Sequence, residues 1–362
     1  MPNTPTTPRY PLYTPTAQSF ARVVPFDESE DTPFSPSDID TAYSLSSRPD
    51  DGSGVTIAVI GAFGAENLQD DFKDFGRMFG LPENSLEVYY ANGDGTPNTN
   101  TGWDLEAHTD TEWVYAAAPS ARIICVFATD ARMESLFSAV SLAISIGADV
   151  ISMSFGSEEF RSQKQFTDLM KNSGRVFVAS AGDTGGKVVF PSSSDAVVSV
   201  GGTVLHRTRR GNVFARSAWS SGGGGASIYT PIPEWQEIFS GIEALSGRYR
   251  ATPDIALNAA PSPGYYVYSR REGGLVAVGG TSVSAPVFAG ICARILQNNP
   301  SELEGKTMMQ YLYEKAGRTF YSEPQYYFSD VTVGSNGVYT AMRGYDLCTG
   351  LGAPVGNMLI SG

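Results

Sequence analysis

A serine in a glycine-rich setting is the first candidate for covalent chemistry in this chain. The segment Gly279–Pro286 reads Gly-Gly-Thr-Ser-Val-Ser-Ala-Pro and precedes an apolar run that predicts a buried helix from about Thr281. At a helix start the amide dipoles favour a developing oxyanion beside Ser282. We place Pro286 in the first turn, where a missing amide hydrogen costs little. By itself the segment fits a serine nucleophile and, equally, an ordinary Ser/Thr helix cap.

A serine nucleophile needs a base, and the chain has few histidines that could serve as one. The chain has two histidines, His108 and His206. A subtilisin-like Ser-His-Asp triad would place an aspartate directly after the first buried strand, but residues 61–64 read Gly-Ala-Phe-Gly. His206 stands in a basic cluster and is predicted to be a surface residue. The sequence therefore gives little support to a histidine triad.

Carboxylates are the alternative base. Residues 103–115 predict a helix that leads into a run of alanines, and Glu106 and Asp110 are four residues apart on one face of it. His108 lies two residues from each and therefore points to another face. Two like charges at this spacing are unfavourable unless they share a proton or serve chemistry. The plain alternative is a solvated acidic face, but the small and apolar residues that follow favour burial.

A third carboxylate follows a buried strand. Asp183 stands in Ala181-Gly182-Asp183-Thr184-Gly185, after the apolar strand predicted at 176–180. An aspartate among glycines is usually a turn residue. When protonated, it can also donate a hydrogen bond to an oxyanion.

The elements that must position these residues alternate between strand and helix. Apolar β-rich runs predict strands at 55–60, 122–127, 149–154, 176–180 and 197–200, and helical patterns separate them. Strands that are apolar throughout are typical of a parallel sheet covered on both faces, with ligand sites at the carboxyl ends of the strands. We expect an α/β fold with a mostly parallel central sheet, an extension at 1–35 and one catalytic domain at 36–362. Residues 219–226, with four consecutive glycines, predict a flexible loop.

Bulk properties exclude several classes of protein. The formal net charge of −13 disfavours nucleic-acid binding. Three cysteines are too few for a disulfide scaffold, and Cys125 and Cys292 lie in apolar runs typical of buried residues. We expect no membrane span, and we find no signal-peptide pattern in the Pro- and Thr-rich residues 1–31.

From about Pro36 onward the chain resembles the sedolisin family of serine-carboxyl peptidases. The resemblance rests on the Glu-x-x-x-Asp helix, the Ala-Gly-Asp-x-Gly turn, the Gly-Thr-Ser-x-x-x-Pro segment and a C-terminal tail, in the family's order. It implies a subtilisin-like α/β fold. It also implies Ser282 as nucleophile, Glu106 as general base, Asp110 as the residue that positions Glu106, and Asp183 in the oxyanion hole.

The resemblance also implies one structural calcium ion. Ser329-Asp330-Val331-Thr332 and Arg343-Gly344-Tyr345-Asp346 are similar to the family's calcium loop. Oxygen ligands suit Ca²⁺. Relatives often have glycine at the position of Met342. The implied ligands are the carboxylates of Asp330 and Asp346 and the carbonyls of Val331, Met342 and Gly344.

Substrate, location and assembly are expectations from the same resemblance. We expect an acid-active endopeptidase on peptide or protein substrates, with a tripeptidyl aminopeptidase or a peptide-binding pseudoenzyme as alternatives. Ser152 to Gly156 resembles a segment that lines the family's substrate cleft, and it reads equally well as a core strand. We expect a monomer that acts outside the cell or in an acidic compartment, with the cytoplasm left open. Sedolisins are usually made with a long prosegment, for which residues 1–35 are too short.

Overall fold

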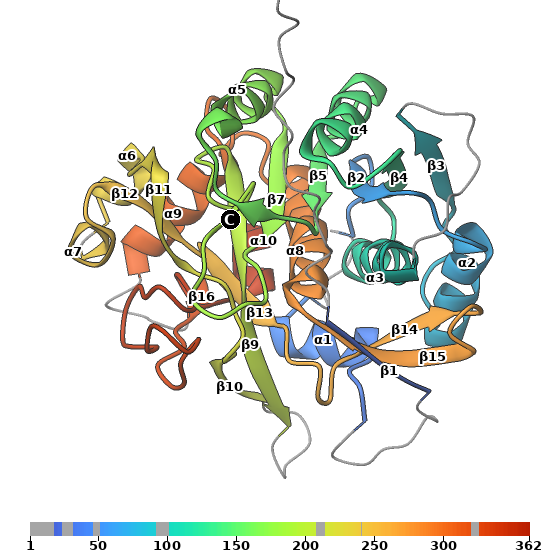
Figure 1. Ribbon diagram of the computed structural model, residues 1–362. Coiled ribbons are helices and arrows are strands. Elements are labelled where there is room, and N and C mark those ends of the chain that lie inside the picture. Colours follow the sequence, from blue (N-terminus) through green and yellow to red (C-terminus); the bar gives the residue numbers. More distant parts are fainter. Residues whose placement is uncertain are drawn as a thin grey trace, which may run out of the picture.

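The computed structural model describes residues 18–23 (backbone only), 32–45, 51–91, 101–207, 214–239, 241–319 and 326–362. Its central sheet has eight strands among these residues, in the order β10-β9-β7-β5-β2-β4-β3, with β13 paired to β9 (Figure 1). The neighbouring strands run parallel except β9 and β10. The bounds are β2 Thr56–Ala62, β3 Leu86–Tyr90, β4 Arg122–Ala128, β5 Val150–Met153, β7 Val176–Ser180, β9 Val197–Arg207, β10 Phe214–Ala218 and β13 Ile255–Asn258.

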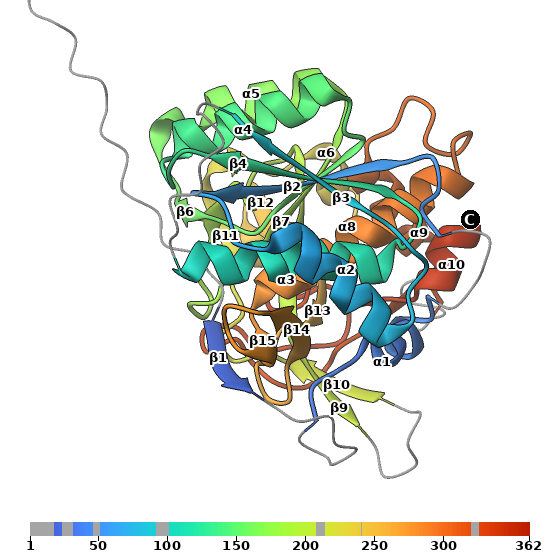
Figure 2. The same cartoon turned by 90° about the vertical axis from the view of Figure 1, so that its right-hand side faces the viewer.

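Helices cover both faces of this sheet, which confirms the predicted fold class. Figure 2 shows α4 and α5 above the sheet and α3 and α8 below it. Two large apolar clusters, one on each side, account for the unbroken hydrophobic runs of β2, β4 and β5. The bounds of the helices are α1 Pro36–Tyr43, α2 Leu68–Phe79, α3 Thr101–Ala117, α4 Met133–Ile146, α5 Lys164–Ser173, α6 Glu234–Glu237, α7 Ile242–Ser246, α8 Thr281–Asn298, α9 Met308–Thr319 and α10 Gly356–Ser361.

Shorter strands complete the structure around the sheet. An antiparallel three-stranded sheet joins β1, β15 and β14, and three two-stranded ribbons pair β11 with β12, β16 with β17 and β6 with β8. Their bounds are β1 Gln18–Val23, β6 Ser157–Glu158, β8 Val189–Phe190, β11 Gly225–Pro231, β12 Tyr249–Thr252, β14 Tyr265–Ser269, β15 Gly274–Gly279, β16 Phe328–Ser329 and β17 Ala353–Pro354.

The N-terminal extension predicted at 1–35 lies largely outside the described residues. Its described parts are tied to the body of the protein. The strand β1 pairs with β15, and Phe34 is fully buried in the core. Ser35 caps α1 by accepting from the Asp38 amide, and the Asp38 carboxylate accepts from the Ser35 amide in return.

Candidate active site

Ser282 lies at the start of α8, as the sequence predicts. The strand β15 ends at Gly279, and Gly280 then takes a φ of 117°, a conformation that glycine alone adopts readily. A Cβ on Gly279 would lie 2.4 Å from the Cα of Pro261, so this approach also requires glycine. The turn delivers Ser282, fully buried, to the amino end of a long apolar helix.

The position of Pro286 differs from the prediction. Because α8 begins at Thr281, Pro286 lies beyond the first turn and inside the helix. At this position a proline removes the amide that would bond to the carbonyl four residues earlier, which belongs to Ser282.

The acid pair lies on α3, which packs directly against α8. Glu106 and Asp110 are buried, with 2% and 1% of their surfaces exposed. The solvated acidic face is therefore excluded for this helix. Burial is the main cause that raises the pKa of Glu106 well above its ordinary value, and the charge of Asp110 raises it further, whereas the Ser282 hydroxyl lowers it. The effect of the Ser282 hydroxyl on this pKa indicates that the two side chains are near each other, although neither Glu106 oxygen has a partner of normal hydrogen-bond geometry among the described residues.

Asp183, which follows the carboxyl end of β7, contacts the first residue of α8. Its Oδ1 accepts from the Thr281 amide at 2.9 Å and from the Thr281 hydroxyl at 2.6 Å. Burial raises the pKa of Asp183 to about 7, while its bonds from Thr281 lower the pKa in part. Asp183 therefore carries its proton in acid, and its partner Thr281 is the residue directly before the nucleophile.

The glycine loop beside Asp183 is ordered by hydrogen bonds rather than flexible. All four glycines of 222–225 are buried, and the loop exchanges backbone bonds with residues 182–187: Gly186 to Gly222, Gly223 to Gly182 and Gly224 to Lys187. A Cβ on Gly223 would lie 1.9 Å from the Ala181 carbonyl oxygen, so the glycines serve close backbone packing. The prediction of a flexible loop is wrong for this reason.

The two histidines make their contacts elsewhere. His108 is fully buried, and its ring nitrogens lie 2.8 Å from the Asp104 carbonyl oxygen and 3.1 Å from Asp71 Oδ2. Asp71 belongs to α2, so this ring serves the junction of α2 and α3. His206 is exposed and contacts Ser217. The geometry thus brings carboxylates, rather than imidazoles, to Ser282.

Four of the five residues implied as calcium ligands are joined in pairs by hydrogen bonds in the C-terminal loop. Asp346 Oδ2 accepts from the Met342 amide, and Asp330 Oδ2 accepts from the Gly344 amide, each at 3.0 Å. Among the described residues, Asp330 Oδ1 is buried without a hydrogen-bond partner, and no cluster of three acidic, His or Cys side chains is present. Burial raises the pKa of both aspartates. Two carboxylates, an unsatisfied oxygen and an oxygen-only donor set fit a hard cation such as Ca²⁺.

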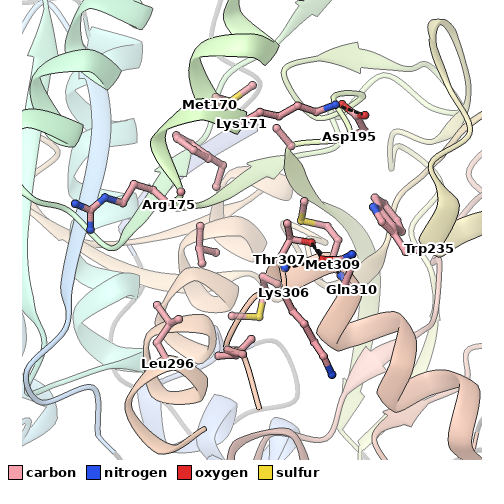
Figure 3. Close-up of a pocket in the computed structure, with 16 residues that line it drawn as sticks. Met170, Lys171, Arg175, Asp195, Trp235, Leu296, Lys306, Thr307, Met309 and Gln310 are labelled. Carbon is pink, nitrogen blue, oxygen red and sulfur yellow. Dashed lines mark hydrogen bonds and ion pairs between the residues drawn. The ribbon is translucent and has the colours of Figure 1, made fainter. Parts of the chain in front are cut away.

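A separate pocket of about 560 Å³ lies away from these residues. Figure 3 shows its apolar walls, which include Trp235, Leu296 and Met309, and the Lys171–Asp195 ion pair at its side. Leu296 and Ser282 are fourteen residues apart on α8, or about 20 Å along a helix. We therefore do not assign this pocket to the reaction at Ser282.

Two features expected from the composition can be checked in the part of the chain that the structure describes. All three cysteines lie within it, and all are buried thiols without a disulfide. No helix in these residues is both long and apolar enough to cross a membrane.

Comparison with known proteins defines the class. A sequence profile of the subtilase family matches residues 90–338, and the chain belongs to this family of serine-type peptidases. Within the family its relationship is to the sedolisins. Kumamolisin from Bacillus sp. (strain MN-32) is 32% identical over 91% of this chain, and sedolisin from Pseudomonas sp. (strain 101) is 27% identical over 88%. Tripeptidyl-peptidase 1 from Dictyostelium discoideum is 27% identical over 78% of the chain.

The likeness extends to solved structures. Pseudomonas sedolisin, described as a serine-carboxyl proteinase complexed with two molecules of pseudo-iodotyrostatin, matches with a TM-score of 0.80 and 25% identity, covering 91% of this chain and 98% of that one. The chain spans 63%, 59% and 50% of the lengths of the curated kumamolisin, sedolisin and tripeptidyl-peptidase 1.

Proposed function

We propose that this protein is an acid-active serine-carboxyl endopeptidase that cleaves peptide bonds through an acyl intermediate on Ser282. The observation that carries the proposal is the buried meeting of Glu106, Asp110 and Asp183 around the start of α8, with Glu106 and Ser282 close enough to influence each other. We favour an endopeptidase because the sedolisin of known structure, described as a serine-carboxyl proteinase, covers 91% of the chain, whereas tripeptidyl-peptidase 1 covers 78%.

The proposed reaction moves one proton at each step. Ionised Glu106 takes the hydroxyl proton of Ser282 as Oγ bonds to the substrate carbonyl carbon. Protonated Asp183 and the Ser282 amide donate hydrogen bonds to the resulting oxyanion. The carbon–nitrogen bond then breaks, and Glu106 returns its proton to the leaving amine. Water repeats the sequence on the acyl intermediate and releases the acid product.

Coupling among the carboxyl groups sets the pH range. Asp183 must keep its proton, and its pKa of about 7 places the upper limit of activity near neutrality. The charge of ionised Asp183 raises the pKa of Glu106. A neutral Asp183 removes this contribution, and it therefore favours the ionisation of Glu106 that catalysis needs.

Replacing Asp183 with asparagine tests its proposed role by two readouts. We expect kcat to fall about 10²- to 10³-fold because a weaker donor faces the oxyanion. Folded Asp183 binds its proton more tightly than an unfolded aspartate, so its stabilising contribution is complete in strong acid and is lost as the pH rises through about 7. The neutral amide of the Asp183→Asn variant avoids that loss, so urea unfolding at pH 8 should show the variant more stable than wild type by on the order of 4 kcal/mol. Equal pH dependence of the two proteins would contradict the assignment.

The calcium proposal rests on the C-terminal loop. Bound Ca²⁺ would be held by the carboxylates of Asp330 and Asp346, with the carbonyls of Val331, Met342 and Gly344 as further ligands. We expect calcium to raise the melting temperature of chelator-treated protein; at 100 times the dissociation constant the gain is about 2.7 kcal/mol. Asp330→Asn should abolish most of this shift. A melting temperature unchanged by calcium would reject the site.

Digestion of a denatured protein at pH 4, with the fragments identified by mass spectrometry, tests the proposed activity. Internal cuts support the endopeptidase, and successive tripeptides from the amino terminus would replace it with a tripeptidyl-peptidase. Binding of peptides without any cleavage would show instead that the protein is a peptide-binding pseudoenzyme. The relationship to the sedolisins also leads us to propose an extracellular location or an acidic compartment, with peptides or proteins as substrates.

A further inference from the structure

Ser154 joins the nucleophile to the acid pair, and we propose that it is a positioning residue of the reaction. Its hydroxyl ties the backbone carbonyl of Ser282 to the carboxyl group of Asp110. The catalytic part of this inference rests on the proposed function; the structural part does not.

The contacts of Ser154 are short and fully buried. Ser154 directly follows β5 at the carboxyl end of the sheet, and 1% of its surface is exposed. Its Oγ lies 2.7 Å from Asp110 Oδ1 and 3.2 Å from the carbonyl oxygen of Ser282. Three separate elements, β5, α3 and α8, are thus connected through one hydroxyl group.

The carbonyl of Ser282 has a specific need for such a donor. In an α-helix that carbonyl accepts from the amide four residues later, and the residue four later is Pro286, which has no amide hydrogen. A buried carbonyl that loses its helical donor requires another one. The Ser154 hydroxyl supplies a hydrogen bond from outside the helix, and it does so at the nucleophile itself.

The single hydroxyl hydrogen makes this contact sensitive to the proton on Asp110. When Asp110 is ionised, the shorter contact draws the hydrogen of Ser154 toward the carboxylate. When Asp110 is protonated, its acid group can donate to Oγ, and the Ser154 hydrogen turns to the Ser282 carbonyl. Burial raises the pKa of Asp110, so the second arrangement is favoured in acid. Ser154 thereby transmits the protonation state of the acid pair to the first turn of α8.

Three replacements of Ser154 test the catalytic part on a peptide substrate. Ser154→Ala should lower kcat about 10- to 100-fold with little change in KM, because the nucleophile is misplaced rather than removed. Ser154→Cys should behave like Ser154→Ala, since a thiol fills the space but donates weakly. Ser154→Thr, which keeps the hydroxyl, should restore most of the activity.

The pH profile separates positioning from plain packing. The hydrogen bond from Ser154 lowers the pKa of Asp110, so its removal keeps Asp110 neutral to higher pH. A neutral Asp110 does not raise the pKa of Glu106, so the acid limb of kcat, which reports the ionisation of Glu106, should move to lower pH in the Ala and Cys variants alone. An Ala variant with wild-type kcat and profile, or a Thr variant as impaired as Ala, would overturn the catalytic part.

A thermodynamic cycle with Pro286→Ala tests the structural part without any need for activity. Pro286→Ala gives the helix back an amide that can bond to the Ser282 carbonyl. In acid, where the Ser154 hydrogen points to the Ser282 carbonyl, Ser154→Ala should therefore lower the melting temperature more in the wild-type background than in the Pro286→Ala background, by about 1–2 °C for one hydrogen bond. Equal losses in both backgrounds would overturn the contact. If wild type cleaves no peptide, the proposed function fails, and this cycle still decides the role of Ser154 in the fold.

Discussion

Ser282→Ala is expected to reduce kcat by about 10⁶-fold, because no other group can form the acyl intermediate. The side chain is buried at the start of α8, next to the proposed base. Removing one oxygen leaves the backbone donors of the oxyanion hole in place, so KM should change little. The measurement is kcat at the acid optimum, together with labelling of the protein by a serine-directed covalent inhibitor. The variant should show neither turnover nor label.

Ser284→Ala is the matched control for this experiment. Ser284 lies two residues further along α8, is equally buried, and donates to the Asn258 carbonyl at 2.9 Å. Its loss should lower stability but leave the label and most of the activity. If Ser282→Ala still formed an acyl intermediate, or if Ser284→Ala abolished it, Ser282 would not be the nucleophile.

Glu106→Gln should reduce kcat by about 10⁴-fold or more, since glutamine has nearly the same shape and cannot accept the proton of Ser282. The replacement also removes a buried carboxylate whose ionisation is opposed by burial and by Asp110. The variant should therefore be no less stable than wild type near neutral pH. A low kcat with unchanged stability would show that the variant has lost the base and kept the fold. The measurements are kcat and the free energy of unfolding in urea.

The histidines provide the controls for the choice of base. His206 is exposed and contacts Ser217, so His206→Gln should leave kcat unchanged. His108 contacts Asp71 and Asp104 on the α2 side of α3, so His108→Gln should act on stability far more than on kcat per folded molecule. If Glu106→Gln kept substantial activity and His108→Gln lost it, the general base would be His108 rather than Glu106.

Much of the fold could be predicted because its elements carry strong local patterns. The buried parallel strands are continuous apolar runs, and the helix after Gly280 is apolar over four turns. Strand ends were less accurate: the strand predicted at 197–200 extends to Arg207 because β10 pairs with its far half. Such pairing between segments is not visible in either segment alone.

The site, like the fold, has parts that local sequence predicts and parts that depend on packing. Glu106, Asp110, Asp183 and Ser282 could be proposed from residue types, spacing and resemblance. In the structure all four are buried, and contacts through Ser154 and Thr281 connect Asp110 and Asp183 to the start of α8. Two features depended on packing. The glycines of 222–225 suggested a flexible loop, but backbone bonds to residues 182–187 hold them. In the sequence Ser154 belongs only to a segment that resembles part of the substrate cleft, and its role is indicated by Pro286 because α8 begins at Thr281.

The central claim is that carboxyl groups, one ionised and one protonated, replace histidine in the chemistry of Ser282. The most direct test is the pH dependence of kcat/KM for a peptide substrate, measured for wild type from pH 2 to pH 9. We expect a maximum in acid and a fall in activity as the pH rises through about 7, where Asp183 loses its proton. Activity that instead rose through neutrality to a maximum above pH 8 would contradict this claim.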